Sequence, residues 1–370
     1  FRRVLFRSKR KLRFFICGII QLSVSVFFFF IAAFVSGAMK NHTPYAVEIY
    51  DTEGLNISTA QVSSFAAPGE FTAAGTGEKV LVADIGENKT VSAYYQETTP
   101  NYGEYVKLNF REGEYFSADM SEKNVVAIPE SLSKELLQKK NEGQKRLYIN
   151  GEEFTVCGVY EDGDVLTQLG SADIPVIYGK IPEGSETLAE HILIKADEGK
   201  TAGQQQQETA ILMKTPLEGE INDLGHLHQL GDSILLLGFF LAGLWFVLYL
   251  CIFSYKRLMS VYEGKENTAQ RRLNIIFAVG IFLFAVIGFA LLLQLVQIPA
   301  IYLPENNIFD ISYYGKEILN GIQQINTDGR IKDFSRICAV YLGTETMLIV
   351  VAVPLFWAGC QKLRRGLKIS

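Results

Sequence analysis

Four long stretches without charge constrain the fold of this chain most strongly. Residues 14–39, 233–255, 273–304 and 337–361 contain one acidic residue, Glu345, and no lysine or arginine. A helix of about 20 apolar residues crosses the hydrocarbon core of a bilayer, so each stretch is long enough to span it. The average composition, with 20% charged residues, conceals this segregation. The sequence therefore predicts a multi-pass membrane protein and excludes a soluble protein, a secreted protein and a single-pass anchor.

The charge of the connecting segments predicts the orientation. Segments 1–13, 256–272 and 362–370 hold 16 basic and two acidic residues, whereas residues 40–231 hold 15 basic and 31 acidic residues. Because lysine and arginine stay on the cytoplasmic side, we predict the first three to be cytoplasmic and the last to be extracytoplasmic. Both termini are then inside, in the cytoplasmic membrane of a bacterial cell. The acidic outer domain argues against nucleic acid as a partner.

The predicted fold class is a membrane protein with four transmembrane helices and a large extracytoplasmic α+β domain between the first and second helix. In order, the predicted segments are the cytoplasmic N-terminus (1–13), first span (14–39), extracytoplasmic domain (40–231), second span (232–255), cytoplasmic loop (256–272), third span (273–298), extracytoplasmic loop (299–336), fourth span (337–361) and cytoplasmic C-terminus (362–370). The first span follows basic residues, as a signal peptide does, but its 26 uncharged residues favour a retained span. Residues 1–8 equal the translation of a common sequencing-library adapter, and we predict that they are an assembly artefact.

Local patterns in the outer domain predict a mixture of strands and helices. Runs rich in Val, Ile, Tyr and Thr predict strands at residues 79–85, 90–96, 105–110, 125–128, 146–149, 154–160, 174–178 and 191–195. Helices are predicted at 59–65, with Ser58 as N-cap, at 130–140 and at 204–214. Asn150-Gly151 predicts a hairpin turn. In the second outer loop, residues 311–325 predict an amphipathic helix.

Three neighbouring segments then carry a resemblance to a known family. They are LNFREGEYFS at 108–117, VVAIPESL at 125–132 and GQKRLYINGEEFTVCGVY at 143–160. This run resembles the periplasmic core domain of MacB-type permeases, and the layout of one span, a large outer domain and three further spans resembles the MacB and FtsX permease superfamily. The apolar alternation around the hairpin is typical of folding residues and not of ligand chemistry.

The resemblance implies the permease subunit of an ABC transporter complex. It implies a separate ABC ATPase subunit that binds ATP, a second permease copy or paralogue as dimer partner, and movement of the outer domain that exports or extracts a peptide, lipoprotein or drug. The loop 256–272 lacks the Glu-Ile-Gly pattern that the family usually places there. An alternative class is therefore a non-transporting membrane signalling or scaffold protein that regulates an envelope enzyme.

Two places are predicted to matter for function. The candidate ATPase-coupling residues are Lys256, Arg257, Leu258, Met259 and Tyr262, although a basic segment of this kind also fixes topology and contacts anionic lipid. Glu345 is the candidate intramembrane polar site, since a carboxylate inside a span usually faces the bundle interior. Alternatively, the fourth span begins later and Glu345 lies at the level of the outer headgroups.

Signatures of catalysis and of cofactor binding are not found, and we expect no enzymatic activity from this chain. The run Gly75-Thr76-Gly77-Glu78-Lys79 lacks the glycine before the lysine and the hydroxyl after it that a phosphate-binding loop needs. His226 and His228 have no acidic or cysteine companion in pattern, so no metal site is predicted. Cys157 is the one cysteine of the outer domain, which rules out a disulfide within it.

Overall fold

The structure is a computed structural model, in which two compact units can be described. It describes residues 2–65, 70–84, 89–120, 123–137, 145–171, 174–182, 184–197, 199–262, 268–296, 312, 316 and 333–367. The helical unit comprises Phe1–Gly37, Gln229–Phe309 and Leu342–Ser370, and the outer-domain unit comprises Ala38–His228 and Asp310–Tyr341. The predicted amphipathic helix at 311–325 lies almost entirely outside the described residues.

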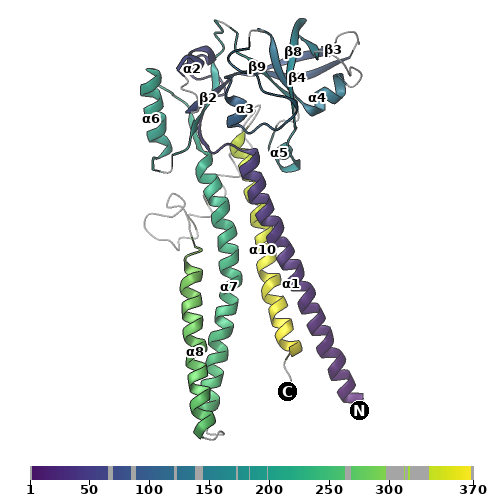
Figure 1. The fold of residues 1–370 in the computed structure, drawn as a ribbon, viewed down its shortest axis with the longest axis vertical. Coiled ribbons are helices and arrows are strands. Elements are labelled where there is room, and N and C mark those ends of the chain that lie inside the picture. The colour runs from purple at the N-terminus through teal and green to yellow at the C-terminus, as the bar shows by residue number, and fades with distance from the viewer. Residues whose placement is uncertain are drawn as a thin grey trace. The chain divides into compact units, whose positions relative to one another are not determined.

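Among the described residues, four helices are long and apolar enough to cross a membrane. They are α1 (Arg2–His42), α7 (Leu224–Tyr262), α8 (Thr268–Leu293) and α10 (Phe334–Leu367). Large apolar side chains such as Phe30, Phe34 and Ile276 are more than 70% exposed, which suits helices that face lipid. The helices α7 and α8 follow one another directly in the chain, while strands separate α1 from α7 (Figure 1). The chain is therefore a multi-pass membrane protein.

Small and hydroxyl residues bring α1 and α10 together within the helical unit. Ser25 donates a hydrogen bond of 2.8 Å from Oγ to the carbonyl of Ala352. Gly18 and Gly359 face each other across the contact, and a Cβ on Gly18 would lie 2.8 Å from the backbone nitrogen of Leu363. Close approach through small residues is the usual way in which helices associate where no hydrophobic force drives them together.

The helix α7 packs on its neighbours through aromatic and polar contacts. Phe29 of α1 stacks on Phe239 with ring centroids 5.0 Å apart, and the Trp357 indole of α10 donates to the Leu241 carbonyl at 3.0 Å. On the side of α8, Ser254 donates from Oγ to the Ala278 carbonyl at 2.7 Å. Each hydroxyl or indole thus satisfies a backbone carbonyl, as an apolar surrounding requires.

In the part of the outer domain that the structure describes, eleven strands form one mixed sheet. Their bounds are β1 (Ala46–Tyr50), β2 (Phe71–Gly75), β3 (Glu78–Asp84), β4 (Thr90–Thr98), β5 (Phe110–Gly113), β6 (Val125–Pro129), β7 (Arg146–Ile149), β8 (Glu152–Tyr160), β9 (Val176–Lys180), β10 (Ala189–Lys195) and β11 (Glu220–Asp223). The pairings β4–β3–β7–β8–β6–β9–β4 close into a ring, in which β4–β9 and β6–β8 are parallel. The strands β2, β10, β1 and β11 extend from β4 as an open arm, and β5 pairs with β8 outside the ring.

Each part of the sheet has its own apolar core. The ring encloses Val82, Ile128, Leu147 and Ile177 together with Leu132 of α4 (Glu130–Leu136). The arm packs its apolar face against two helices, α2 (Thr59–Phe65) and α6 (Ala202–Met213). Two short helices, α3 (Tyr102–Tyr105) and α5 (Val165–Gly170), complete the domain (Figure 1).

The first and last strands of the outer domain lie beside each other. β1 follows α1 after three residues, and β11 runs directly into α7. The two strands pair antiparallel, with Val47 opposite Asp223 and Tyr50 opposite Glu220, and the Tyr50 hydroxyl also donates to the Glu220 carboxylate. The chain thus enters and leaves this domain on adjacent strands.

Most of the predicted elements of the outer domain are confirmed, and some are wrong. Helix α2 has the predicted bounds, and Ser58 caps it by accepting from the Gln61 amide at 3.2 Å. The hairpin turn is confirmed, with Asn150 and Gly151 both at positive φ between β7 and β8. The predicted strand at 105–110 is wrong, because a helical turn at residues 102–105 precedes it and β5 begins only at Phe110. The strands β1, β2 and β11 were not predicted.

Candidate functional site: the helix ends in the outer domain

Three of the apolar helices have their outer ends inside the outer-domain unit. Residues 38–42 of α1, 224–228 of α7 and 334–341 of α10 belong to it. Polar side chains gather at these ends, and we refer to them as the helix-end cluster. Its members are His42, Thr43, Lys107, Asp164, Thr167, His228 and Tyr341.

Asp164 is the centre of this cluster. It is the N-cap of α5, and its Oδ1 accepts from the Thr167 amide and from the Thr167 hydroxyl, each at 2.9 Å. The same oxygen accepts from the Tyr341 hydroxyl of α10 at 2.5 Å, and the hydroxyls of Thr167 and Tyr341 are 2.9 Å apart. On the other side, Nε2 of His42 lies 4.0 Å from Oδ2. One carboxylate therefore caps α5, accepts a hydrogen bond from α10 and lies near the end of α1.

Lys107 and Thr43 secure the end of α1. The Lys107 amine donates to the Lys40 carbonyl, one of the last carbonyls of the helix, which have no partner within it. The Thr43 hydroxyl shares a 2.7 Å hydrogen bond with Nε2 of His228, which is 4% exposed in the first turns of α7. This buried pair joins the end of α1 to the start of α7, the two helices that flank the outer domain.

The start of α10 packs on a buried polar group of the sheet. The Phe334 ring meets the edge of the His191 ring at 6.0 Å, and His191 stacks on Tyr102 while its Nε2 hydrogen-bonds to the Tyr102 hydroxyl at 2.9 Å. The Glu48 carboxylate lies 3.8 Å from Nδ1 of the same histidine. Further along α10, Ile337 lies against Gly170, where a Cβ would approach its Cα to 2.7 Å.

The surroundings shift the pKa values of Asp164 and Lys107. Burial alone would raise the pKa of Asp164, but the hydrogen bonds from Tyr341 and Thr167 outweigh it and hold the pKa below its usual value. Burial lowers the pKa of Lys107, whose amine lies against α1. The carboxylate is therefore ionised over the neutral range and keeps its three hydrogen bonds there.

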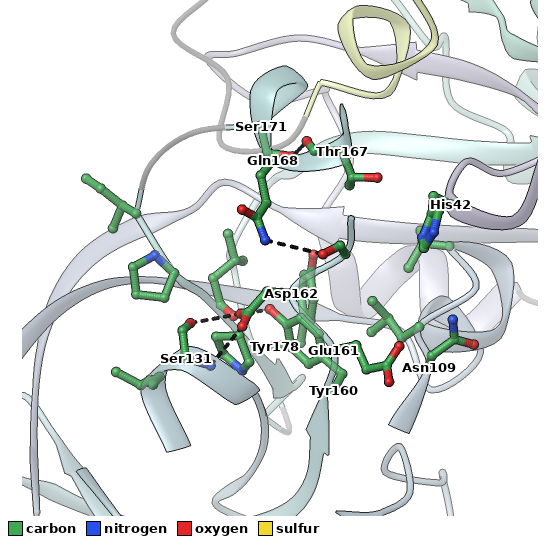
Figure 2. A pocket seen from close by; sticks show the side chains of 18 of the residues that line it. His42, Asn109, Ser131, Tyr160, Glu161, Asp162, Thr167, Gln168, Ser171 and Tyr178 are labelled. Atoms are coloured by element: carbon green, nitrogen blue, oxygen red, sulfur yellow. Dashed lines mark hydrogen bonds between the residues drawn. The ribbon is translucent and has the colours of Figure 1, made fainter. Parts of the chain in front are cut away.

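A cavity of about 470 Å³ lies beside the cluster and shares His42, Lys107 and Thr167 with it (Figure 2). Its floor includes Tyr160 and Tyr178 of the sheet. The other lining side chains come from the segment that leads into β5, from α4, from the turn after β8, from α5 and from the segment before β9.

Polar contacts hold the mouth of this cavity in place. Both carboxylate oxygens of Asp162 accept from Ser131 at the start of α4, from its amide at 2.9 Å and its hydroxyl at 2.8 Å, and Gln168 donates to the Gly163 carbonyl at 3.2 Å (Figure 2). The Ser131 hydroxyl is thus bonded to a carboxylate, and no histidine approaches it among the described contacts. Ser131 therefore connects the start of α4 to the turn after β8 in the lining of the cavity.

The predicted coupling residues are not in a loop, because α7 continues through them to Tyr262. Arg257 is turned to α8, where its guanidinium donates to Asn274 at 2.8 Å and lies 5.8 Å from the ring centres of Phe253 and Phe277. The remaining predicted side chains are exposed on the last two turns of α7: Lys256, Leu258, Met259 and Tyr262, the last at 83%.

Glu345 has no exposed surface in the helical unit. It lies one turn before Ile349, which packs against Gly238 of α7 next to the Phe29 ring. On a helix, residues four apart share a face, so Glu345 is on the side of α10 that is turned to α7. Its role in the membrane stays a prediction.

The other residues singled out in the sequence have structural contacts. His226 pairs with Asp223 at 2.5 Å, and His228 belongs to the helix-end cluster. Among the described residues, no three histidine, cysteine or acidic side chains come together as a metal site would require. Cys157 donates from Sγ to the Val126 carbonyl at 3.3 Å, and burial raises its pKa to about 11.

Sequence reasoning missed the members of the cluster other than His228. Asp164-x-x-Thr167 is the pattern of an N-cap followed by the residue whose amide it accepts, and this signal could have located α5. No local signal connects Asp164 to Tyr341, which lies 177 residues further along the chain.

Comparison with known proteins agrees with the class that this structure defines, a multi-pass membrane protein with a mixed-sheet domain between its first two apolar helices. The sequence model of the MacB-like periplasmic core domain matches residues 22–210, from within α1 to within α6. The chain belongs to the family defined by this domain, that of the MacB-like ABC transporter permeases.

Three solved structures resemble part of the chain. The periplasmic region of MacB from Actinobacillus actinomycetemcomitans is 14% identical over 50% of this chain and 91% of that one, with a TM-score of 0.38. The extracellular domain of the noncanonic ABC-type transporter YknZ from Gram-positive bacteria is 12% identical over 46% and 92%, with a TM-score of 0.35. A domain of a putative permease protein from Porphyromonas gingivalis is 14% identical over 51% and 97%, with a TM-score of 0.34. No curated protein matches the sequence.

Proposed function

We propose that the chain is the permease subunit of an ABC transporter that transmits motion to its outer domain. A separate ATPase subunit binds and hydrolyses ATP on the cytoplasmic side, and a second permease copy or a paralogue completes a dimer. The chain itself catalyses no reaction. It lies in the cytoplasmic membrane with both termini inside, as the distribution of basic residues predicts. The movement exports or extracts a peptide, lipoprotein or drug.

The observation that carries this proposal is the helix-end cluster. A displacement of α10 acts directly on Asp164 through Tyr341, and a displacement of α1 acts on His228 through Thr43. Both contacts are polar and have strict geometry, so a helix cannot slide without breaking them or moving the domain with it. Such coupling suits a permease whose outer domain does mechanical work.

The exposed apolar side chains at the end of α7 support the position of the ATPase. Leu258 and Tyr262 lie one turn apart on one face, with Met259 beside them. Exposed apolar residues next to basic ones are typical of a contact with another protein. This face offers a docking surface without the Glu-Ile-Gly pattern of the family.

The proposal is tested by purifying the tagged chain from its native membranes in mild detergent, with mass spectrometry and an ATPase assay on the eluate. We expect a stoichiometric ABC ATPase that is lost from L258D/M259D and retained by the control V165D/L169D, which changes two exposed apolar residues of α5. D164N/Y341F should retain the ATPase but lose the ATP-dependent change in distance between spin labels on two outer domains. Absence of an ATPase even after crosslinking would favour the regulatory scaffold.

A further inference from the structure

A second cavity, of about 450 Å³, lies between α7 and α10 in the helical unit. From α7 it is lined by Trp245, Leu248, Tyr249 and Ile252, and from α10 by Trp357, Gln361, Arg364 and Arg365. Neither the predicted coupling face of α7 nor Glu345 contributes to it. We call it the α7–α10 groove.

Aromatic rings form one ordered wall of this groove. Trp245 and Tyr249 stack one turn apart, with ring centroids 5.6 Å apart and planes within 2°. Trp357 is fixed on the opposite helix by the hydrogen bond from its indole to the Leu241 carbonyl. The rings therefore present an apolar surface whose geometry is already set before anything binds.

Two guanidinium groups give the groove its charge. Arg364 is half-buried and lies 5.0 Å from the centre of the Tyr249 ring, while Arg365 is exposed at the rim. Among the described residues that line the groove, none is acidic. The helix dipole alone would explain an arginine in the last turn of α10. It does not explain why Arg364 lies over the Tyr249 ring beside a cavity. Planar guanidinium groups bind phosphate with paired hydrogen bonds.

The position of the groove along the predicted spans indicates what can occupy it. Its residues come from the second half of the predicted span 232–255 and from the end of the predicted span 337–361, except the two arginines, which belong to the predicted cytoplasmic C-terminus 362–370. Both positions are at the cytoplasmic boundary of the membrane, where tryptophan, tyrosine and arginine meet lipid headgroups. An occupant here needs an apolar part for the rings and an anionic part for the arginines.

We propose that the α7–α10 groove binds an anionic phospholipid of the cytoplasmic leaflet. The headgroup phosphate contacts Arg364 and Arg365, and the beginning of an acyl chain lies against Trp245 and Tyr249. This site is independent of the proposed transport function and adds a specific lipid to the partners of the chain.

The two tryptophans of the protein both line this groove, so tryptophan fluorescence reports on this groove. The purified full chain is placed in phosphatidylcholine nanodiscs that contain, at the same mole fraction, either phosphatidylglycerol or phosphatidylcholine with brominated chains. We expect quenching by the brominated phosphatidylglycerol to exceed that by the brominated phosphatidylcholine by about twofold or more. R364Q/R365Q should bring the ratio to about one, whereas R271Q/R272Q, which removes two charges from the basic end of α8, should leave it unchanged.

Several outcomes would overturn the proposal. A ratio of one between the two quenching values in the wild-type chain would contradict the proposal. This test needs no variant, so it remains valid if size-exclusion elution shows that R364Q/R365Q does not fold. If inorganic phosphate changes the tryptophan emission in pure phosphatidylcholine nanodiscs, the arginines bind a soluble anion and not a lipid headgroup. Equal quenching together with a disulfide crosslink between two copies of L248C would assign the groove to a second copy of the chain.

Discussion

The Tyr341 hydroxyl of α10 donates a 2.5 Å hydrogen bond to Oδ1 of Asp164, the N-cap of α5. This bond connects residues 177 positions apart and joins a helix end to the cap of a domain helix. Because Tyr341 is fully buried, an alternative partner in water is not available to its hydroxyl when Asp164 changes. The pair is therefore the most direct place to test the helix-end cluster.

Removing this hydrogen bond should destabilise the protein measurably. We expect Y341F, which removes the donor, and D164N, which replaces the charged acceptor by a weaker neutral amide oxygen, each to cost about 1–2 kcal/mol in unfolding free energy, and the double variant to cost less than the sum because both changes act on the same bond. Thermal unfolding by circular dichroism in detergent measures this. Y262F, which changes an 83% exposed tyrosine, should have no effect, and strict additivity would contradict a direct interaction.

The pKa of Asp164 predicts a pH dependence with a defined sign. Hydrogen bonds from Tyr341 and Thr167 place this pKa below the usual value, so the folded state favours the ionised form. The resulting stabilisation is present above about pH 4, the pKa of an unfolded aspartate, and is lost as the pH falls through the lower folded value. The difference in melting temperature between wild type and D164N should therefore be constant from neutral pH down to about pH 5 and shrink in more acidic solution. A constant difference down to pH 3 would refute this assignment.

The contact between α1 and α7 can be probed with an isosteric change. T43V removes the hydroxyl that bonds to the buried His228, and we expect a local loss of about 1–2 kcal/mol. In T43V, peptides at the end of α1 and the start of α7 should exchange their amide hydrogens faster than in the wild type, as measured by mass spectrometry. T346V is the matched control, because the Thr346 hydroxyl donates to the Leu342 carbonyl of its own helix, and its effect should stay below about 0.5 kcal/mol.

Cys157 should react slowly with thiol reagents. Burial raises its pKa to about 11, so the thiolate is scarce at neutral pH. We expect that its alkylation rate in the native chain still increases between pH 9 and pH 10.5. Mass spectrometry of the peptide that contains Cys157 measures this rate. In denaturant the same peptide should approach a plateau near pH 9, because an unperturbed thiol has a pKa of about 8.5. Identical profiles in both states would show that the thiol is not buried.

Two glycines at positive φ differ in what surrounds them. Gly113 of β5 has a φ of 66°, and a Cβ there would lie 2.0 Å from the Cys157 carbonyl oxygen. Gly151 of the hairpin has a φ of 90° and no atom within 4 Å of an added Cβ. G113A should therefore cost about 3 kcal/mol or more and G151A about 1 kcal/mol. Guanidinium unfolding followed by far-ultraviolet circular dichroism ranks them, and equal losses would contradict the close packing of β5 on β8.

Local patterns predict the parts of this fold that follow local rules. The hairpin of β7 and β8 was predicted because Asn150-Gly151 has the turn chemistry that the hairpin needs. β1 was missed because Glu48 interrupts its apolar run, although this side chain is fully buried beside His191. β2 was missed because its alanines and its terminal glycine have little preference for a strand.

The candidate site could not be predicted because its members are held together only by tertiary structure. Four of its members come from separate segments of the chain: His42, Lys107, Asp164 and Tyr341. In the sequence, each of them is an ordinary polar residue. The sequence indicated the exposed apolar residues at the end of α7, but not that Arg257 beside them binds Asn274 of α8. Spacing along a chain carries no information about such partners.

The pairing of β1 with β11 has a consequence for how such a protein can change over time. Since the chain enters and leaves the outer domain on neighbouring antiparallel strands, the domain is an insertion with adjacent ends. A different insert, or a turn of a few residues, could connect α1 to α7 at the same separation. The membrane helices and the outer domain could thus be exchanged among permeases, provided that the contacts at the helix ends are rebuilt.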